Sequence, residues 1–271
     1  MISINISALH PMNNSLRQRL KEVTLFKISV ITIRELLSKR NLLSKIKELF
    51  CFYKSYIKYK RLNCNLRFSL KTSNIYPRLF DNTKETYIDP VYFYQDTWCA
   101  KKIFVMKPSS HYDVGSKADL VGIISQFVPT TMVDIRPLPV DLPDLKFLKG
   151  TLLALPFKDE EISSLSSICV IEHIGLGRYG DPLDQYGSEK AAAELTRVLA
   201  PGGSLYISVP VDDSNKVYFN AHRAFTREYI LEIFKPLILL EERYIYGNQL
   251  YDNYKPESGF GTGLFEFKKT K

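Results

Sequence analysis

The stretch "SEKAAAELTRVLAPGGSLYISVPV", residues 188–211, indicates a helix, a stop and a strand in direct succession. Small and apolar residues recur at helical spacing as far as Ala200. The "PGG" at 201–203 ends the helix, because proline removes a backbone donor and glycine favours turn conformations. The apolar, partly β-branched segment "SLYISVPV" then has the length and composition of a strand. This succession is typical of an α/β protein with a parallel sheet.

The same alternation of strands and helices extends over the chain from about residue 108. Seven strands are expected, at 109–116, 130–137, 145–150, 163–174, 204–211, 237–247 and 259–269. Helices are expected at 118–128, 188–200 and 226–235, the last of them with Thr226 as its N-cap. We therefore expect an α/β fold with a doubly wound, mostly parallel sheet and an antiparallel edge formed by the last two strands.

Charge divides the 271-residue chain into two parts. The formal net charge is +8, yet residues 1–80 alone hold 16 basic and 3 acidic residues. Apolar residues recur every three or four positions over 15–61, with lysine and arginine in most of the gaps. The sequence thus predicts a basic helical arm over 1–61, a connector packing on the body over 62–107, and an α/β domain over 108–271.

The basic arm allows two interpretations. It can be a helical hairpin that packs on the body, or a helix that lies on an anionic membrane surface with its apolar side toward the lipid. Tyrosines interleave with lysines near residues 52–61, but no nucleic-acid recognition motif accompanies them, so nucleic acid is not an expected partner.

Cysteine spacing and hydropathy bear on the compartment. The cysteines, Cys51, Cys64, Cys99 and Cys169, form no C-x-x-C pair and have no histidine at zinc spacing, so no metal site is expected. The start of the chain lacks the pattern of a signal peptide. The early apolar segment at 23–33 is 11 residues long and contains Lys27, which is too short for a membrane span. We expect a cytoplasmic protein, with the arm as a candidate peripheral contact with the inner membrane face.

A literal G-x-G-x-x-G occurs at Gly175, Gly177 and Gly180, in "GLGRYG". A dinucleotide-binding fingerprint belongs at the first strand–helix turn, whereas this pattern follows the fourth predicted strand and leads into "DPLDQYG". We therefore interpret the loop as a pocket wall or as an ordinary surface loop. The first alternative is favoured, because ligands of open α/β sheets bind beyond the carboxyl ends of the strands.

The first strand–helix turn itself is "YDVGSKADL", residues 112–120. Asp113 and Gly115 end the first strand, and Asp134 ends the second strand 21 residues after Asp113. That separation is typical of a fold in which an acid at the end of the second strand holds a ribose diol. The other interpretation of Asp134 is a turn residue at a strand end.

Several motifs, in this order, resemble class I S-adenosylmethionine-dependent methyltransferases over roughly 108–268. They are "DVGS", "VDIRP", "GTLLALPFKDEE", "VIEHI", "ELTRVLAPGGSLYISVPV" and "HRAFTREYI". More narrowly, "EHIGLGRYGDPLD" followed by "NAHRAF" resembles an uncharacterised methyltransferase-like family that is often associated with cell-surface polysaccharide gene clusters. The resemblance implies S-adenosylmethionine as cofactor and a sugar or glycan intermediate as substrate.

The resemblance also implies roles for individual residues. The cofactor would be bound by Asp113, Gly115, Ser116, Asp134, Ile135, Thr151 and Leu155. His173 or Glu172 would act as the base that deprotonates the acceptor hydroxyl. From their positions in two loops, Arg178, Tyr179, Asp181, His222 and Arg223 are candidate substrate-binding residues, and the two arginines could clamp an anionic group.

Two departures from the family pattern keep a second function open. The first turn retains one glycine instead of three, and Thr151 stands where an acid usually accepts the adenine amino group. The alternative to an enzyme is therefore a non-catalytic methyltransferase-like module that binds a glycan or a partner enzyme.

Overall fold

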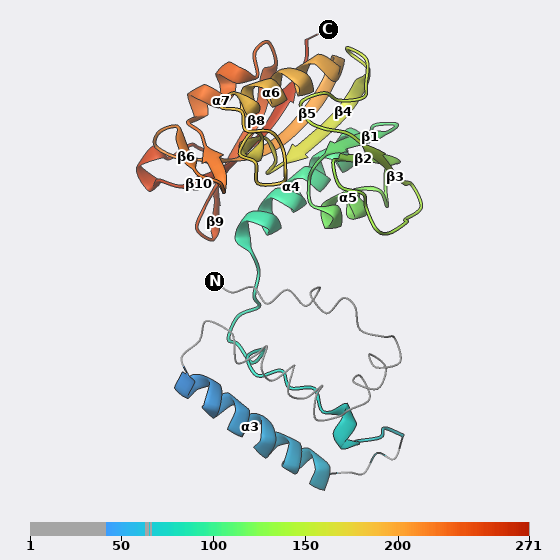
Figure 1. The fold of residues 1–271 in the computed structure, drawn as a ribbon, viewed down its shortest axis with the longest axis vertical. Coiled ribbons are helices and arrows are strands. Elements are labelled where there is room, and N and C mark those ends of the chain that lie inside the picture. Colours follow the sequence, from blue (N-terminus) through green and yellow to red (C-terminus); the bar gives the residue numbers. More distant parts are fainter. Residues whose placement is uncertain (1–41, 63–64, 66, 271) are drawn as a thin grey trace. The chain divides into compact units, whose positions relative to one another are not determined.

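The computed structural model describes residues 42–62, 65 and 67–270 (Figure 1). The chain divides into two compact units, Met1–Tyr87 and Ile88–Lys271, which are described one at a time. The domain boundaries expected from the sequence stay predictions. Of the four cysteines, Cys64 lies outside the described residues, and the other three are free thiols.

The first unit contains the helix α3 (Leu42–Arg61) and the short 3-10 helix η2 (Thr72–Asn74). The predicted helical arm is thus observed over 42–61, while its part at 15–41 lies outside the described residues. Exposed apolar side chains follow one another at three- and four-residue spacing along α3: Leu43, Ile46, Phe50, Tyr53 and Ile57. In the described part of the chain, no helix is both long and apolar enough to cross a membrane.

The second unit is built on an eight-stranded sheet with the order β3-β2-β1-β4-β5-β10-β8-β9. Five strands are parallel: β1 (His111–Val114), β2 (Thr130–Asp134), β3 (Leu145–Lys149), β4 (Ile162–Ile168) and β5 (Leu199–Val211). Three antiparallel strands complete it: β8 (Ile238–Tyr246), β9 (Gln249–Tyr251) and β10 (Gly261–Lys268). The predicted mostly parallel sheet with an antiparallel edge is confirmed.

Helices cover both faces of this sheet (Figure 1). Along β5, Leu205 and Ile207 belong to one buried apolar cluster and Tyr206 to another, because successive strand residues point to opposite faces. The first cluster includes residues of α6 (Gly187–Val198) and α7 (Arg227–Ile233). The second includes residues of α4 (Pro90–Met106) and α5 (Ala118–Ile124). The doubly wound arrangement is therefore observed as two separate cores.

The helix α4 lies in the segment that the sequence analysis treated as a connector. Asp89 caps it by accepting hydrogen bonds from the amides of Val91 and Tyr92, and Pro90 occupies its first turn. An Asp–Pro pair before an apolar run is a recognisable helix start. The predicted cap of α7 is confirmed, since the Thr226 hydroxyl accepts from the Tyr229 amide at 3.3 Å.

Two further details differ from the expected pattern. The fourth strand ends at Ile168 and not at Ile174, because Cys169 adopts a left-handed backbone with φ of 55° and a 3-10 turn, η3 (Ile171–His173), follows. A hairpin of β6 (Lys216–Tyr218) and β7 (His222–Ala224) was not expected from the sequence.

Candidate functional site

Two adjoining pockets lie at the carboxyl ends of β1, β2 and β4. The strand order reverses between β1 and β4, which is the point where open α/β sheets bind ligands. The inner pocket is lined mainly by residues at the carboxyl ends of β1, β2, β3 and β4. The outer pocket adds the start of α4 and residues that follow β5. Both are lined by Gly115, Asp134, Arg136, Cys169, His173 and Tyr179.

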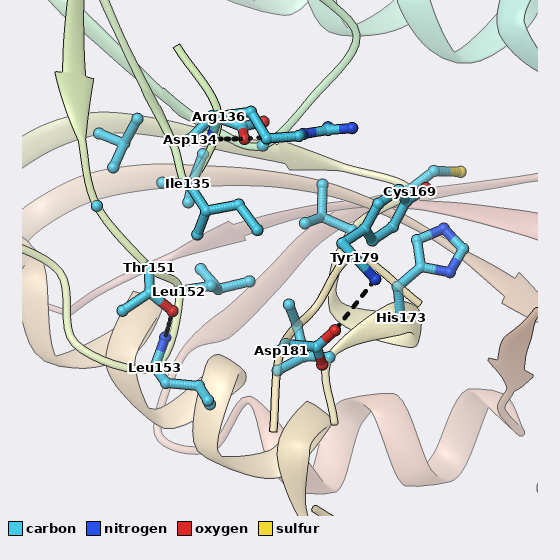
Figure 2. A pocket seen from close by; sticks show the side chains of 16 residues that line it. Asp134, Ile135, Arg136, Thr151, Leu152, Leu153, Cys169, His173, Tyr179 and Asp181 are labelled. Atoms are coloured by element: carbon cyan, nitrogen blue, oxygen red, sulfur yellow. Dashed lines mark hydrogen bonds and ion pairs between the residues drawn. The ribbon is translucent and has the colours of Figure 1, made fainter. Parts of the chain in front are cut away.

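The inner pocket combines apolar walls with two carboxylates, Asp134 and Asp181 (Figure 2). Ile135, Leu152 and Leu153 provide the apolar surface. At the end of β2, Asp134 is 8% exposed, and its Oδ1 accepts the amide of Arg136 at 2.8 Å. Among the described residues, no hydrogen bond engages its other oxygen, Oδ2, which leaves an acceptor for a ligand.

The turn after β1 is fixed by a buried carboxylate. Asp113 is fully buried and accepts hydrogen bonds from the Ser116 amide at 3.0 Å, from the Ser116 hydroxyl at 2.6 Å, and from the Ser166 hydroxyl. The Ser116 hydroxyl in turn accepts the amide of Ile168 at 2.9 Å. Burial raises the pKa of Asp113 to about 6, which opposes the effect of these hydrogen bonds. Asp113 thus braces the turn and does not line either pocket.

His111, a buried residue at the start of β1, extends this hydrogen-bond network. Nε2 of His111 lies 2.9 Å from the Ser166 hydroxyl and Nδ1 lies 2.8 Å from the Ser164 hydroxyl. Burial lowers the pKa of His111 to about 3, so the imidazole is neutral at physiological pH. The serines of β4 are therefore explained as hydrogen-bond partners inside an otherwise apolar sheet.

The glycines of "GLGRYG" shape the loop at 174–186. Gly175, Gly177 and Gly180 all have φ between 68° and 84°, a region that favours glycine. Asp181 closes the loop by accepting the amide of Gly175 at 2.6 Å and that of Tyr179 at 3.3 Å. The observed geometry is a tight polar loop beside the pockets.

Arg223 holds the same loop from beneath. It is 8% exposed and donates to the carbonyls of Ile174 at 2.5 Å and Asp184 at 2.9 Å, and to the Ser188 hydroxyl at 3.2 Å. Both terminal nitrogens of its guanidinium therefore donate hydrogen bonds within the protein. Arg223 lines neither pocket, so its predicted place beside a substrate is replaced by a bracing position.

Tyr179 lies close to two arginines and lines both pockets. Its ring centroid is 4.9 Å from the guanidinium carbon of Arg136 and 5.1 Å from that of Arg178. The ring of His173 packs edge-on against it at 5.6 Å. Figure 2 shows Tyr179 and His173 together, across the cavity from Ile135 and Thr151.

Glu172 and His173 both have strongly shifted pKa values in the outer pocket. Glu172 is 1% exposed, its Oε2 has no hydrogen-bond partner among the described residues, and burial raises its pKa to about 8. Burial lowers the pKa of His173 to about 4. Since Nδ1 of His173 lies 2.7 Å from the Ala221 carbonyl, which can only accept, Nδ1 carries the proton and Nε2 presents a lone pair. That Nε2 lies 3.7 Å from Oε1 of Glu172.

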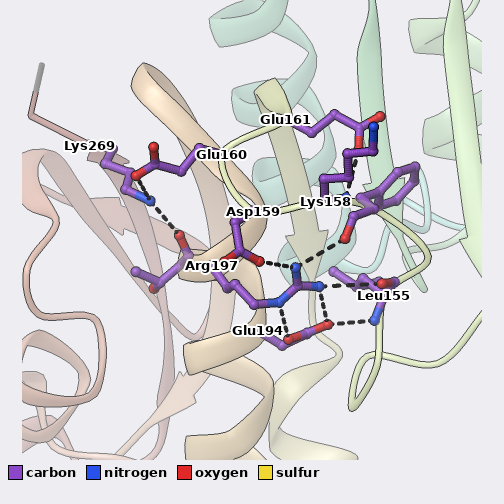
Figure 3. Close-up of polar contacts among 10 residues, drawn as sticks. Leu155, Lys158, Asp159, Glu160, Glu161, Glu194, Arg197 and Lys269 are labelled. Atoms are coloured by element: carbon purple, nitrogen blue, oxygen red, sulfur yellow. Dashed lines mark hydrogen bonds and ion pairs between the residues drawn. The ribbon is translucent and has the colours of Figure 1, made fainter.

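A separate ion-pair network braces the turn at 155–159 (Figure 3). Arg197 pairs with Glu194 through two bonds of 2.6 and 2.8 Å, and also reaches Asp159 at 2.6 Å and the Phe157 carbonyl at 3.0 Å. Glu194 accepts the amide of Leu155 at 2.6 Å. Leu155 is therefore buried behind the pockets, and Leu152 and Leu153 occupy the wall position that was expected of it.

The pockets collect most of the residues that the sequence singled out. The lining includes Gly115, Ser116, Asp134, Ile135, Thr151, Glu172, His173, Arg178, Tyr179, Asp181 and His222. Asp113, Leu155 and Arg223 lie behind the walls. Sequence reasoning missed Arg136, Tyr92 and Phe260, which also line the outer pocket. Arg136 could have been found from its place directly after the strand that ends in Asp134, whereas Tyr92 and Phe260 come from segments without a motif.

Comparison with known proteins identifies the fold. The structure of a candidate sarcosine dimethylglycine methyltransferase from Galdieria sulphuraria is 15% identical, with a TM-score of 0.51 over 68% of this chain and 92% of that chain. The N-methyltransferase NodS from Bradyrhizobium japonicum WM9 is 14% identical, with a TM-score of 0.50 over 71% of this chain and 100% of its own. At such identities the likeness concerns the fold, which is the Rossmann-like methyltransferase fold expected from the sequence.

Sequence comparison adds a family without an assigned activity. The family model described as "Caenorhabditis protein of unknown function, DUF268" matches residues 158–235, which include β4, the "GLGRYG" loop, α6 and β5. No curated protein matches the chain.

The residues of the inner pocket fit an S-adenosyl group. Asp134 offers a free acceptor oxygen for ribose hydroxyls, and Ile135 with Leu152 offers apolar surface for a flat base. The Thr151 hydroxyl accepts the Leu153 amide at 3.3 Å and lines the same pocket. Gly115 has φ of 74°, and a Cβ there would come within 2.9 Å of Val170, so this single glycine is required at the turn. In the described part of the chain, no cluster of His, Cys, Asp or Glu could hold a metal ion.

Proposed function

We propose that this chain is an S-adenosylmethionine-dependent methyltransferase. The observation that carries the proposal is the carboxylate of Asp134, in which one oxygen has no hydrogen-bond partner among the described residues. It lies in an apolar-walled pocket that adjoins a second, polar pocket. The first can hold a nucleoside and the second an acceptor, and the methyltransferase fold places both at the same sheet edge. S-adenosylmethionine supplies the methyl group when it is bound.

The chain's own residues would position the reactants. Asp134 would hold the ribose hydroxyls, and Ile135 and Leu152 would hold the base by contact. Tyr179 lines both pockets, with Arg136 and Arg178 close to its ring. Methyl transfer in line between two held groups depends chiefly on this alignment.

Glu172 is the better candidate for the base. A group whose pKa is close to the working pH combines the required protonation state with proton affinity, and Glu172, near 8, meets this condition better than His173, near 4. We propose that Glu172 accepts the acceptor's hydroxyl proton and that neutral His173 orients that hydroxyl through Nε2. The sequence left the base open between His173 and Glu172, and the two pKa shifts favour Glu172.

The proposed acceptor is a sugar hydroxyl of a glycan intermediate. The outer pocket offers imidazoles at His173 and His222 together with the rings of Tyr92 and Phe260. Such a mixture suits a ligand that presents both hydroxyl groups and apolar C–H faces. A role in surface polysaccharide synthesis rests on the family resemblance alone. The alternative is a non-catalytic module that binds a glycan, and it is supported by the first turn, which keeps a single glycine.

Replacing Asp134 tests the cofactor site. Asp134→Ala should weaken binding of S-adenosylhomocysteine by about 1.5–3 kcal/mol, or roughly 10- to 150-fold, because it removes charge-assisted hydrogen bonds to the ribose. Isothermal titration calorimetry on the full chain measures this. Asp252→Ala, at an exposed carboxylate outside both pockets, should bind like the wild type. Equal loss in both variants would contradict the assignment, and no binding by the wild type would support the non-catalytic module.

We also propose a peripheral membrane contact through α3. Its exposed apolar stripe at 43–57 is accompanied by Lys47, Lys54, Lys58, Lys60 and Arg61, against one acidic residue, Glu48. An apolar face bordered by cations is the pattern of helices that lie on anionic lipid.

Flotation with liposomes tests α3. The full chain should float with vesicles containing phosphatidylserine, and the double variant Ile46→Ser with Phe50→Ser should lose most of that binding because two exposed apolar anchors are removed. Raising the salt concentration should weaken the wild type, since surface charges are screened within a Debye length. A matched pair of surface changes on the body, Leu240→Ser and Ile238→Ser, is the control. If the two double variants float to the same extent, the proposed contact through α3 is refuted.

A further inference from the structure

A pair of arginines flanks Tyr179 where the acceptor would enter. Arg136 follows β2 and Arg178 lies in the "GLGRYG" loop, so two segments far apart in sequence bring two guanidinium groups close to the same ring. Their guanidinium carbons lie 4.9 and 5.1 Å from the same ring centroid. Both residues line the outer pocket.

The guanidinium of Arg178 is held by a backbone carbonyl. One terminal nitrogen donates to the Ala221 carbonyl at 2.8 Å, which fixes the orientation of the guanidinium. Among the described residues, no carboxylate forms an ion pair with it. Arg136 has only a long contact, 3.4 Å from its Nε to Asp134, a carboxylate whose other oxygen is free for the ribose.

A third cation borders the same space. Lys117 lines the outer pocket, with its Nζ 5.3 Å from the centroid of Tyr92 and 2.8 Å from Asp119. Lys117 is thus paired, and Asp89 and Asp134 also line this pocket, while Glu172 is buried. The positive charge at the pocket mouth is therefore that of Arg178, together with the loosely paired Arg136, and it attracts an anionic ligand.

We propose that the acceptor carries an anionic group, a phosphate or a carboxylate, which Arg136 and Arg178 bind beside Tyr179. This inference rests on the proposed methyltransferase function and specifies its substrate as an anionic sugar or glycan intermediate. Arginine suits the task because its planar donors match the paired oxygens of either anion. The clamp predicted from sequence paired Arg178 with Arg223, and the geometry replaces Arg223, which braces the loop, by Arg136.

The test uses inorganic phosphate as the probe, titrated into the full chain and followed by ³¹P NMR line broadening in the presence of saturating S-adenosylhomocysteine. Arg178→Gln and Arg136→Gln should each weaken phosphate binding at least fivefold, and Arg178→Lys should recover part of it. Arg243→Gln, at an arginine outside both pockets, is the matched control and should bind like the wild type. Acetate, titrated in parallel, distinguishes a carboxylate preference from a phosphate preference.

Two results would overturn the proposal. One is phosphate and acetate binding that is absent in the wild type or unchanged in both glutamine variants. The other is an effect on the cofactor alone, in which Arg178→Gln weakens the binding of S-adenosylhomocysteine but not that of 5′-methylthioadenosine, which lacks the amino acid carboxylate. Arg178 would then bind the carboxylate of the cofactor and not an anion of the acceptor. If the chain binds no S-adenosylhomocysteine at all, the phosphate titration without it still tests the clamp, so the two proposals fail separately.

Discussion

Glu172→Gln should stabilise the protein at alkaline pH. Burial raises the pKa of Glu172 to about 8 from an ordinary value of 4.5, so between these two pH values the folded state keeps a proton that the unfolded state has lost. Stability contributed by this group is therefore complete below pH 4.5 and is lost as pH rises to about 8. The glutamine variant does not titrate. Relative to wild type, its free energy of unfolding should rise by roughly 2–4 kcal/mol between pH 5 and pH 9.

Urea denaturation at the two pH values measures this difference. Glu189→Gln is a useful control, because Glu189 also has a buried oxygen without a hydrogen-bond partner but lies outside both pockets. The account further expects Glu172→Gln to bind S-adenosylhomocysteine within about twofold of wild type and to lose methyl transfer. Parallel pH dependences of stability for wild type and variant would show that Glu172 titrates normally and is not a base tuned by burial.

Substitution of Gly175 should damage the "GLGRYG" loop far more than the same substitution at Gly180. Both glycines have φ above 80°, so alanine at either position costs about 1–2 kcal/mol in backbone conformation. At Gly175 the added Cβ would also overlap the backbone carbonyl of Asp184, whereas at Gly180 it meets nothing within 4 Å. We expect Gly175→Ala to destabilise the chain by at least about 2 kcal/mol more than Gly180→Ala.

Gly177→Ala provides an intermediate point in this series. Its Cβ would lie 3.1 Å from a methyl group of Leu183, an exposed side chain that can move. Thermal melting and limited proteolysis of the three variants should rank them Gly175, Gly177, Gly180 from most to least disrupted. Equal melting temperatures at Gly175 and Gly180 would mean that the loop is not held in this conformation.

Most of the sheet could be predicted because its strands contain runs of apolar and β-branched residues bounded by turn or helix signals. The Thr226 cap is an example in which local chemistry determines the element. The expected strand at 204–211 lies within β5, but β5 begins at Leu199 and includes the "PGG", which was expected to separate the helix from the strand. The end of β4 could not be predicted, because the left-handed backbone of Cys169 interrupts an apolar run that continues to Ile174. The helix α4 was missed although Asp89 and Pro90 mark its start, since tyrosines and turn residues around it suggested an irregular segment.

The candidate site was predictable at the level of strand ends and less so at the level of side-chain contacts. Asp134 and Thr151 line the inner pocket because they follow β2 and β3. Asp113, Leu155 and Arg223 lie just as close in sequence to strand ends, yet the Ser116 turn, Glu194 and the carbonyls of the loop engage them behind the walls. Only tertiary packing separates these two groups, and the same packing pairs Arg178 with Arg136.

A crystal structure of the protein soaked with S-adenosylhomocysteine tests the central claim most directly. The account predicts ligand density in the inner pocket, with the ribose at Asp134, the base against Ile135, and the sulfur directed toward the outer pocket that holds Glu172 and His173. Density at another place, or an empty inner pocket at saturating ligand, would contradict the assignment of this chain as an S-adenosylmethionine-dependent methyltransferase.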